Sequence, residues 1–152
     1  LKASGQEALV VIVHEYFKRC CGASADVDLK GQSDTGVAKS GRLAAVDDFI
    51  CWRIPAGEFQ WTPFIDNQSF APIHLSAEAG ETYFYKLSSD LRRPPPYAVD
   101  VQSISERYAY HYIQTTLSRV REYNVTGPSP EVIERIKANG PKRVAEKLRC
   151  YY

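Results

Sequence analysis

Two short turn motifs of the same sequence constrain the fold of this chain more than any other feature. Ala56-Gly57-Glu58 and Ala79-Gly80-Glu81 each interrupt a run that is rich in aromatic and β-branched residues. Glycine adopts the positive φ that a tight turn requires, and aromatic and β-branched side chains favour the pleated surface of a strand. Both motifs therefore predict antiparallel β structure with a turn at the glycine.

The first 90 residues contain several segments with the composition of short strands. Leu9 to Phe17 is so rich in β-branched residues that it predicts a central strand buried on both faces. Residues 32–42 are rich in serine, glycine and aspartate, and they predict a mobile loop. Roughly six to eight short strands at close spacing predict a β-sandwich. The remaining predicted strands cover residues 26–31, 43–46, 49–54, 58–61, 70–76 and 81–87.

The pattern changes after residue 90. Three consecutive prolines at 94–96 cannot continue a strand, so residues 91–101 are predicted to be a connector. Ser103 and Glu106 fit a capping box, and Ile104, Tyr108 and Tyr112 then recur at helical spacing. Prolines at 130 and 141 favour two further helix starts. We therefore expect an α+β protein, in which an antiparallel, prealbumin-like β-sandwich over residues 1–90 is followed by two or three helices over residues 102–152 packed on the sheet.

The four cysteines, Cys20, Cys21, Cys51 and Cys150, show no C-x-x-C spacing, so they do not predict a zinc or thioredoxin-like site. Adjacent cysteines rarely bond each other, and neighbours on a strand point to opposite faces. In an oxidising compartment, one of the adjacent pair would reach Cys51 and the other would reach Cys150. The alternative is that the cysteines are reduced and behave as small buried hydrophobes.

The chain contains no methionine, so we expect residue 1 to follow a removed leader, and a cleaved tag is the alternative. No apolar run reaches the length of a membrane helix, so we expect no transmembrane span and place any lipid anchor upstream of residue 1. Residues 1–100 carry a net charge of −3 and residues 101–152 carry +4. The basic residues alternate with apolar ones, which favours solvated faces of amphipathic helices over a surface for acidic partners.

Little in the sequence indicates catalysis. His14, His74 and His111 fall on three different predicted elements, and the Asp47-Asp48 pair falls in a predicted solvated turn. None of the common enzyme signatures occurs. Basic and aromatic residues are not interleaved on the strands as a nucleic-acid platform requires. We therefore expect no catalytic residue, metal, cofactor or nucleic-acid partner.

Aromatic residues crowd the second half of the predicted sandwich, and they supply the candidate binding residues. If one side of the sheet is open there, the aromatics beside Arg53 would form a contact surface for a protein or a glycan. If the helix that contains Tyr108 and Tyr112 covers that side, they belong to the core, which is the arrangement we favour. The candidate binding residues are Trp52, Arg53, Trp61, Tyr83 and Tyr85.

Residues 8–87 resemble the DUF2846 group of bacterial exported proteins, many of them lipoproteins, and more loosely the PEGA-type β-sandwich repeats. The matching segments are residues 8–16, 26–31, 49–57 and 79–85. The resemblance implies a β-sandwich and a place in the periplasm or attached to the outer membrane, and it implies no known activity. The insert over 32–47 and the helical tail depart from the family pattern.

These observations lead to two hypotheses. The first is a non-enzymatic, exported protein that binds another protein in the cell envelope, and a toxin-neutralising immunity protein is a specific form of it. The second is a small enzyme or ligand binder whose site lies between sheet and helices and uses His14, His74 or His111 with the tyrosines. The second hypothesis requires at least two of these side chains to converge on one pocket.

Overall fold

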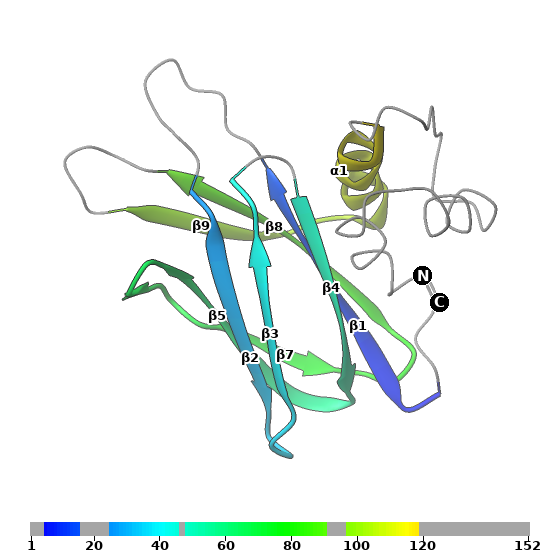
Figure 1. Ribbon diagram of the computed structural model, residues 1–152. Coiled ribbons are helices and arrows are strands. Elements are labelled where there is room, and N and C mark those ends of the chain that lie inside the picture. Colours follow the sequence, from blue (N-terminus) through cyan, green and yellow to red (C-terminus); the bar gives the residue numbers. More distant parts are fainter. Residues whose placement is uncertain (1–4, 16–24, 46–47, 91–96, 119–152) are drawn as a thin grey trace, which may run out of the picture.

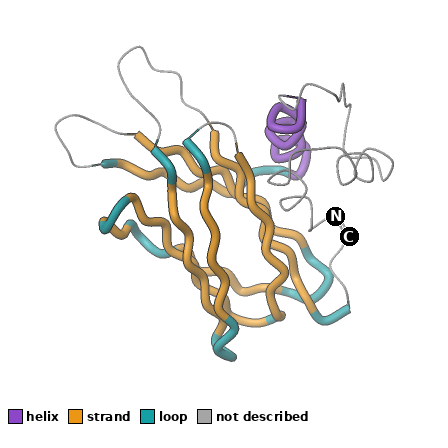
Figure 2. Tube along the Cα trace, viewed as in Figure 1, coloured by secondary structure: helices purple, strands orange, loops and turns teal. Residues whose placement is uncertain are grey.

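The structure is a computed structural model that describes residues 5–15, 25–45, 48–90 and 97–118. These residues form two facing β-sheets with a helix against one of them (Figures 1 and 2). The expected mostly β, two-sheet architecture is thus confirmed. The elements are β1 (Glu7–Glu15), β2 (Val27–Ser33), β3 (Ala38–Leu43), β4 (Asp48–Pro55), β5 (Gly57–Ile65), β6 (Gln68–Ser69), β7 (Ile73–Ala77), β8 (Thr82–Asp90), β9 (Ala98–Ser103) and α1 (Glu106–Ser118).

The first sheet has the strand order β4-β1-β8-β9, and the second has the order β3-β2-β5-β6 with β7 also paired to β5. All pairs in the second sheet are antiparallel. In the first sheet, β1 is antiparallel to β4 but parallel to β8. The expectation of an entirely antiparallel sandwich is therefore wrong at this pair, because β8 reaches β1 only after the chain has passed through the second sheet.

Both Ala-Gly-Glu motifs lie where the chain changes sheets. Gly57 joins β4 of the first sheet to β5 of the second, and Gly80 lies between β7 of the second sheet and β8 of the first. Their φ angles are 121° and 85°, so the predicted positive φ is confirmed at both glycines. The two corners also bond to the start of β1, because the amides of Ala56 and Gly80 donate to the carbonyls of Gln6 and Glu7 at 3.3 and 2.8 Å.

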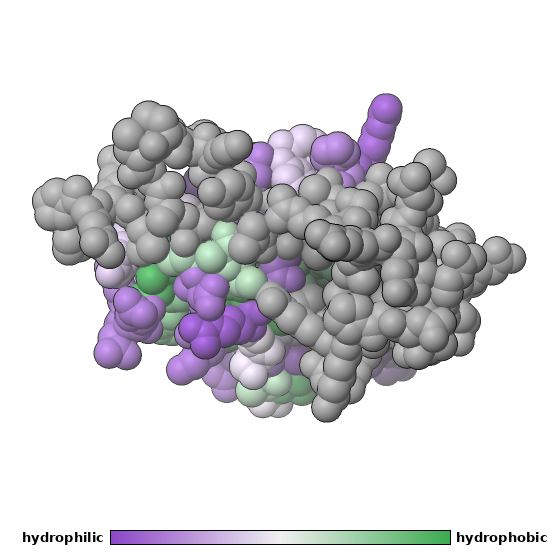
Figure 3. All heavy atoms as spheres, turned by 45° about the horizontal axis from the view of Figure 1, so that its top comes forward, coloured by the Kyte–Doolittle hydropathy of each residue, from purple (hydrophilic) through white to green (hydrophobic). Residues whose placement is uncertain are grey.

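The core between the sheets depends on β1, which lies between β4 and β8 and is buried along nearly its whole length. This confirms the central strand expected from its β-branched composition. Its even-numbered residues Ala8, Val10 and Ile12 pack between the sheets, while Val11 and Val13 face outwards. Figure 3 brings forward the end of the sandwich at which β1 ends, and apolar surface is visible there between polar side chains.

Two glycines within strands make room for this core. A Cβ on Gly31 of β2 would overlap the ring of Phe59 and lie 3.3 Å from Trp52, and one on Gly41 of β3 would overlap Ile50. Gly41 is one of the small and polar residues that make residues 32–42 resemble a loop in sequence. The structure shows instead that β2 and β3 form an antiparallel hairpin, so the expected mobile loop is wrong.

Helix α1 packs on the outer face of the first sheet. Ala109 and Ile113 are fully buried against the outward residues of β1, β4 and β8. The buried face of α1 is rotated from the predicted one, which contained Tyr108, because the Tyr108 side chain is 40% exposed. The cap is also shifted, since the hydroxyl of Ser105, not Ser103, accepts a hydrogen bond from the amide of Tyr108 at 3.2 Å.

The sheet does not end before the prolines. β9 pairs with β8 from Tyr85 to Asp90, so the predicted connector over 91–101 contains the start of a strand. The predicted helices beginning near 130 and 141 lie outside the described residues. Cys51 is disulfide-bonded, and Cys20, Cys21 and Cys150 lie outside the described residues, so the expected pairing stays a prediction.

Candidate functional site

The aromatic residues predicted to bind a partner are mostly core residues. Trp52 is 5% exposed and Trp61 is fully buried, and both lie between the sheets. Their rings meet edge to face with centroids 6.5 Å apart, and the Trp61 ring meets that of Tyr85 at 5.5 Å. The Trp61 indole nitrogen has no hydrogen-bond partner among the described residues. These side chains stabilise the sandwich and do not form an exposed patch.

The remaining candidates do not gather on one surface either. Arg53 lies on the opposite face of β4 and pairs with Glu7 at 3.7 Å. The Tyr83 hydroxyl accepts from the amide of Glu78 at 2.9 Å, which closes the turn before β8. Helix α1 covers Phe84 and not Tyr83 or Tyr85, because alternate residues of β8 face opposite sides. The second sheet, and not the helix, covers the predicted aromatic face.

The three histidines are separated. His14 is 1% exposed between the sheets, His74 is exposed on β7, and His111 is exposed on α1. They do not converge on one pocket, so the geometry required by the enzyme or ligand-binder hypothesis is not found among the described residues. Those residues also contain no group of three or more side chains suited to hold a metal ion.

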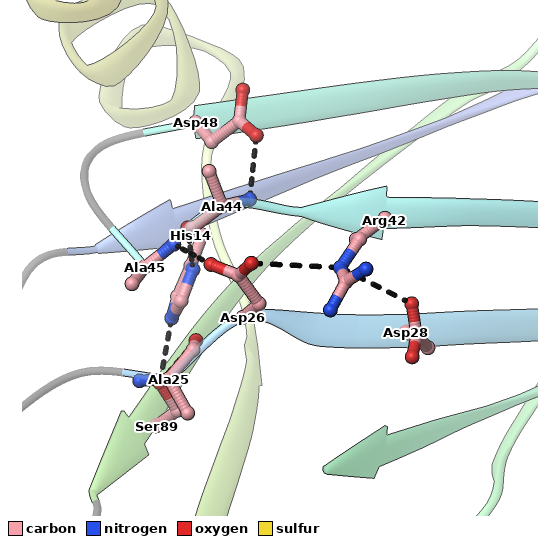
Figure 4. A network of polar contacts seen from close by, with 9 residues as sticks. All are labelled: His14, Ala25, Asp26, Asp28, Arg42, Ala44, Ala45, Asp48 and Ser89. Atoms are coloured by element: carbon pink, nitrogen blue, oxygen red, sulfur yellow. Dashed lines mark hydrogen bonds and ion pairs between the residues drawn. The ribbon is translucent and has the colours of Figure 1, made fainter. Parts of the chain in front are cut away.

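His14 instead organises a buried polar network at one end of the sandwich (Figure 4). Its Nδ1 lies 2.6 Å from the carbonyl oxygen of Ala44, and its Nε2 lies 2.8 Å from the hydroxyl of Ser89. A carbonyl can only accept, so Nδ1 carries the hydrogen. The Ser89 hydroxyl also accepts from the amide of Ala25 at 3.2 Å. The network therefore joins β1 and β8 of the first sheet to the segments that border the second.

Asp48 belongs to the same end of the molecule and is 3% exposed. Its carboxylate accepts from the amides of Ala44 at 2.7 Å and Phe49 at 3.0 Å. The expectation that Asp48 lies in a solvated turn is therefore wrong, because the buried carboxylate joins the amide that follows β3 to that of Phe49 at the start of β4. Asp47 lies outside the described residues. The enclosed groups of this network have a structural role, since solvent does not reach them.

A second polar cluster attaches α1 to the first sheet. The Tyr112 hydroxyl donates to Glu15, and Lys86 pairs with the same carboxylate at 3.2 Å. Burial and the hydrogen bond to Glu15 raise the pKa of Tyr112. Burial lowers the pKa of Lys86, but the hydrogen bond and charge of Glu15 outweigh it, so the pKa of Lys86 is raised. These contacts keep both groups protonated and hold the helix in place.

The outer face of the second sheet carries an open recess. Its polar side chains line a cavity of 450 Å³ over β2, β5 and β7, and a neighbouring recess of 560 Å³ shares Lys30 and Phe64 with it. We call the two recesses together the trough. Outside the shared pair, the polar residues that line it are Asp28, Gln32, Ser33, Asp34, Ser40, Arg42, Glu58, Gln60, Thr62, Asp66, Asn67 and His74.

The pairing of the strands brings three polar side chains together at the centre of the trough. Gln32 pairs with Gln60, and Gln60 pairs with His74, so the three exposed side chains form one row across β2, β5 and β7. Adjacent strands lie ~4.8 Å apart, which is the spacing between members of the row. Within the described part of the chain, these three side chains form no hydrogen bond with one another or with a neighbour.

Sequence reasoning did not identify the trough as a site. The signal was present, because residues 26–31 alternate polar with apolar, as a strand exposed on one face does. The sequence pattern does not show which strands lie side by side in the sheet. Only the pairing of β2 with β5 and of β5 with β7 brings their polar positions together.

No family model matches the sequence, and no curated protein matches it at a significant level. Among solved structures, the chain is similar to the NMR structure of a protein from Eubacterium rectale, with 12% identity and a TM-score of 0.42, over 66% of this chain and 93% of that one. It is also similar to a crystal structure of a candidate cell adhesion protein from Bacteroides ovatus, with 6% identity and a TM-score of 0.40, over 66% of this chain and 43% of that one. Likeness at this level supports no conclusion about function. None of the described helices is long and apolar enough to cross a membrane.

Proposed function

We propose that this chain is a non-enzymatic, exported module of the bacterial envelope that binds another protein through the outer face of its second sheet. The observation that carries the proposal is the trough, whose central polar row makes no hydrogen bonds within the described residues. Exposed polar groups with no internal partner can exchange their hydrogen bonds to water for hydrogen bonds to another molecule. A toxin-neutralising immunity protein is a narrower form of the same proposal.

Two features support the exported, sandwich part of the proposal. Disulfides persist in oxidising compartments such as the periplasm, and Cys51 is disulfide-bonded. The order of the strands, with three antiparallel pairs of consecutive strands and one parallel pair distributed over two sheets, supports a prealbumin-like sandwich, and hence the resemblance to exported sandwich proteins. Attachment to the outer membrane through an upstream lipid remains part of the proposal.

Capture of the partner from a native envelope extract tests the proposal when it is combined with substitutions on defined faces. Gln60→Arg with Thr62→Arg places two bulky charged groups in the trough. Ala98→Arg with Gln102→Arg is the matched control, because it adds the same charge at exposed positions of β9 in the first sheet. The trough variant should reduce the captured partner by about tenfold or more, and the control should not. Equal capture by both variants and the unmodified chain would exclude the trough as the binding surface.

A further inference from the structure

We infer that the partner presents an extended, basic segment and that this segment lies in the trough; the inference rests on the proposed function of the second sheet. Two properties carry it. They are the distribution of charge along the trough and the kind of polar group at its centre.

The trough is acidic, although the whole chain has a net charge of +1. It is lined by four carboxylates and two cations, so its net charge is −2 with His74 neutral. Both cations are already engaged. Arg42 lies 3.5 Å from Asp26 and 3.6 Å from Asp28, and Lys30 lies over the ring of Phe64 at 5.3 Å.

The other carboxylates of the trough form no ion pair with a lysine or arginine among the described residues. Asp34 and Glu58 lie at one end of it, where the amide of Asp34 donates to the carbonyl of Glu58 at 3.0 Å. Glu58 accepts a hydrogen bond from Ser76 at 2.7 Å, and no described Lys or Arg pairs with Asp34 or Glu58. A partner that brings lysine or arginine to this end would complete the charge pairing.

The composition of the face argues against an apolar partner. Among the described residues, the exposed large hydrophobics are Val37 and Tyr108, at 39% and 40% exposure, and neither lines the trough. Protein interfaces that depend on a buried hot spot present aromatic or aliphatic anchors. Of the apolar side chains that line the trough, Leu29 and Phe59 are buried in the core, and Phe64 is half-buried and lies under Lys30.

The central row fits the backbone of an extended segment. Each glutamine side chain offers both a carbonyl acceptor and an amide donor, as a peptide group does, so Gln32 and Gln60 can each satisfy one backbone unit. His74 adds a ring nitrogen at the end of the row. The row thus holds the chain of the partner, while Asp34 and Glu58 select its basic side chains.

Fluorescence anisotropy with labelled synthetic peptides tests the inference directly. The probes are an extended peptide in which lysine alternates with serine and the same peptide with glutamate in place of lysine. We expect the lysine peptide to bind about tenfold more tightly than the glutamate peptide, and its affinity to fall as salt is raised. Equal affinity for the two peptides, or tighter binding of an uncharged oligosaccharide than of either, would overturn the inference.

Two variants that lose the same charge at different places show where the lysine peptide binds. Asp34→Asn with Glu58→Gln removes the two carboxylates at the end of the trough with little change of shape. Glu78→Gln with Glu81→Gln removes the same charge from the exposed turn before β8. The trough variant should weaken binding of the lysine peptide by about fivefold, and the turn variant should leave it unchanged. An equal effect of both variants would show a general charge effect and contradict the inference.

The same variants separate this inference from the proposed function. If Asp34→Asn with Glu58→Gln captures the native partner as well as the unmodified chain, while Gln60→Arg with Thr62→Arg does not, the partner uses the trough but is not selected by charge. If both trough variants capture the partner normally, the proposed function itself fails.

Discussion

At the scale of single residues, His14 shows how a polar side chain can join two sheets. The ring is enclosed, and each of its nitrogens has a partner in a segment more than 25 residues away in sequence, at Ala44 and at Ser89. A buried polar group costs free energy unless it is hydrogen-bonded, so the partners are as important as the ring itself. The histidine was considered for catalysis from sequence, but its partners give it a structural role.

Replacement of Ser89 by alanine should destabilise the protein by about 1–3 kcal/mol, because the His14 ring and the Ala25 amide each lose a partner in a buried site. Urea unfolding followed by circular dichroism measures the change. Ser88→Ala is the control, since Ser88 is a half-exposed neighbour on the same strand. Equal stability of the two variants would show that the network contributes little.

Tyr110 gives a prediction about pH. Burial and the hydrogen bond to Glu106 raise the pKa of Tyr110 from 10.0 to about 12. Between pH 10 and about 12, Tyr110 keeps its proton in the folded protein but has released it in the unfolded chain. The contribution of Tyr110 to the free energy of unfolding is therefore complete below pH 10 and is lost as the pH rises towards 12. Tyr110→Phe should therefore flatten the loss of stability over this range. Glu106→Gln should flatten it only in part, because burial remains, and an unchanged slope in both variants would contradict the assignment.

At the scale of elements, the two Ala-Gly-Glu corners determine the topology. Each takes the chain from one sheet to the other, and each bonds to the start of β1. The sequence indicates the turns because glycine is required there, but it does not indicate that they join different sheets. That property depends on β1 lying between β4 and β8, which is a long-range feature.

Alanine at the two corner glycines should have unequal effects. Gly57 has φ of 121°, where side chains are rarely tolerated, and a Cβ there would lie 3.4 Å from Asp34. Gly80 has φ of 85°, and nothing lies within 4 Å of its Cβ position. We expect a loss of about 1 kcal/mol for Gly80→Ala and about 2–3 kcal/mol for Gly57→Ala. Thermal unfolding measures both, and a larger effect at Gly80 would contradict this account of the corners.

The elements that sequence reasoning found are those with local signals. The β-branched run predicted β1, and the helical spacing after residue 103 predicted α1. β2 was predicted over residues 26–31, but it continues past Gly31, where the lack of a side chain admits Phe59. β3 was missed because Gly41 and its polar neighbours resemble a loop, whereas Gly41 is small in order to admit Ile50. β9 was missed because the prolines before it mark the end of one strand and say nothing of the next.

The same limit applies to the candidate site. The alternation in β2 predicted that one face of that strand is exposed, which the structure confirms. The partners of that face come from β5 and β7, and no local pattern specifies that these strands are neighbours. For the same reason, the aromatic residues were named as binding candidates while a core position under the helix was favoured, since sequence does not show that the second sheet covers Trp52 and Trp61.

At the scale of the whole molecule, the two sheets have different outer surfaces. Helix α1 packs on the outer face of the first sheet through an apolar cluster that contains Phe84, Ala109 and Ile113. The outer face of the second sheet is polar, whereas α1 packs against β1, β4 and β8 of the first sheet. Among the described residues, this asymmetry gives the outer face of the first sheet a structural role and leaves that of the second sheet exposed, as the proposed function requires.

The disulfide at Cys51 should contribute to the stability of the whole molecule. Cys51 is half-buried beside the apolar cluster under α1, and loss of a native disulfide from a small domain costs about 2–5 kcal/mol. Cys51→Ser should therefore lower the free energy of unfolding by about that amount. Adding a reductant to the unmodified chain should have a similar effect, and no effect of the reductant would contradict the prediction.

The central claim is that a protein partner contacts the outer face of the second sheet. Photo-crosslinking from a benzophenone side chain at position 60, in the middle of the trough, tests it most directly, with position 81 as the exposed control outside the trough. In a native envelope extract, we expect crosslinks to one protein from position 60 and none from position 81. Crosslinks to that protein from position 81 alone would place the binding surface elsewhere and contradict the account.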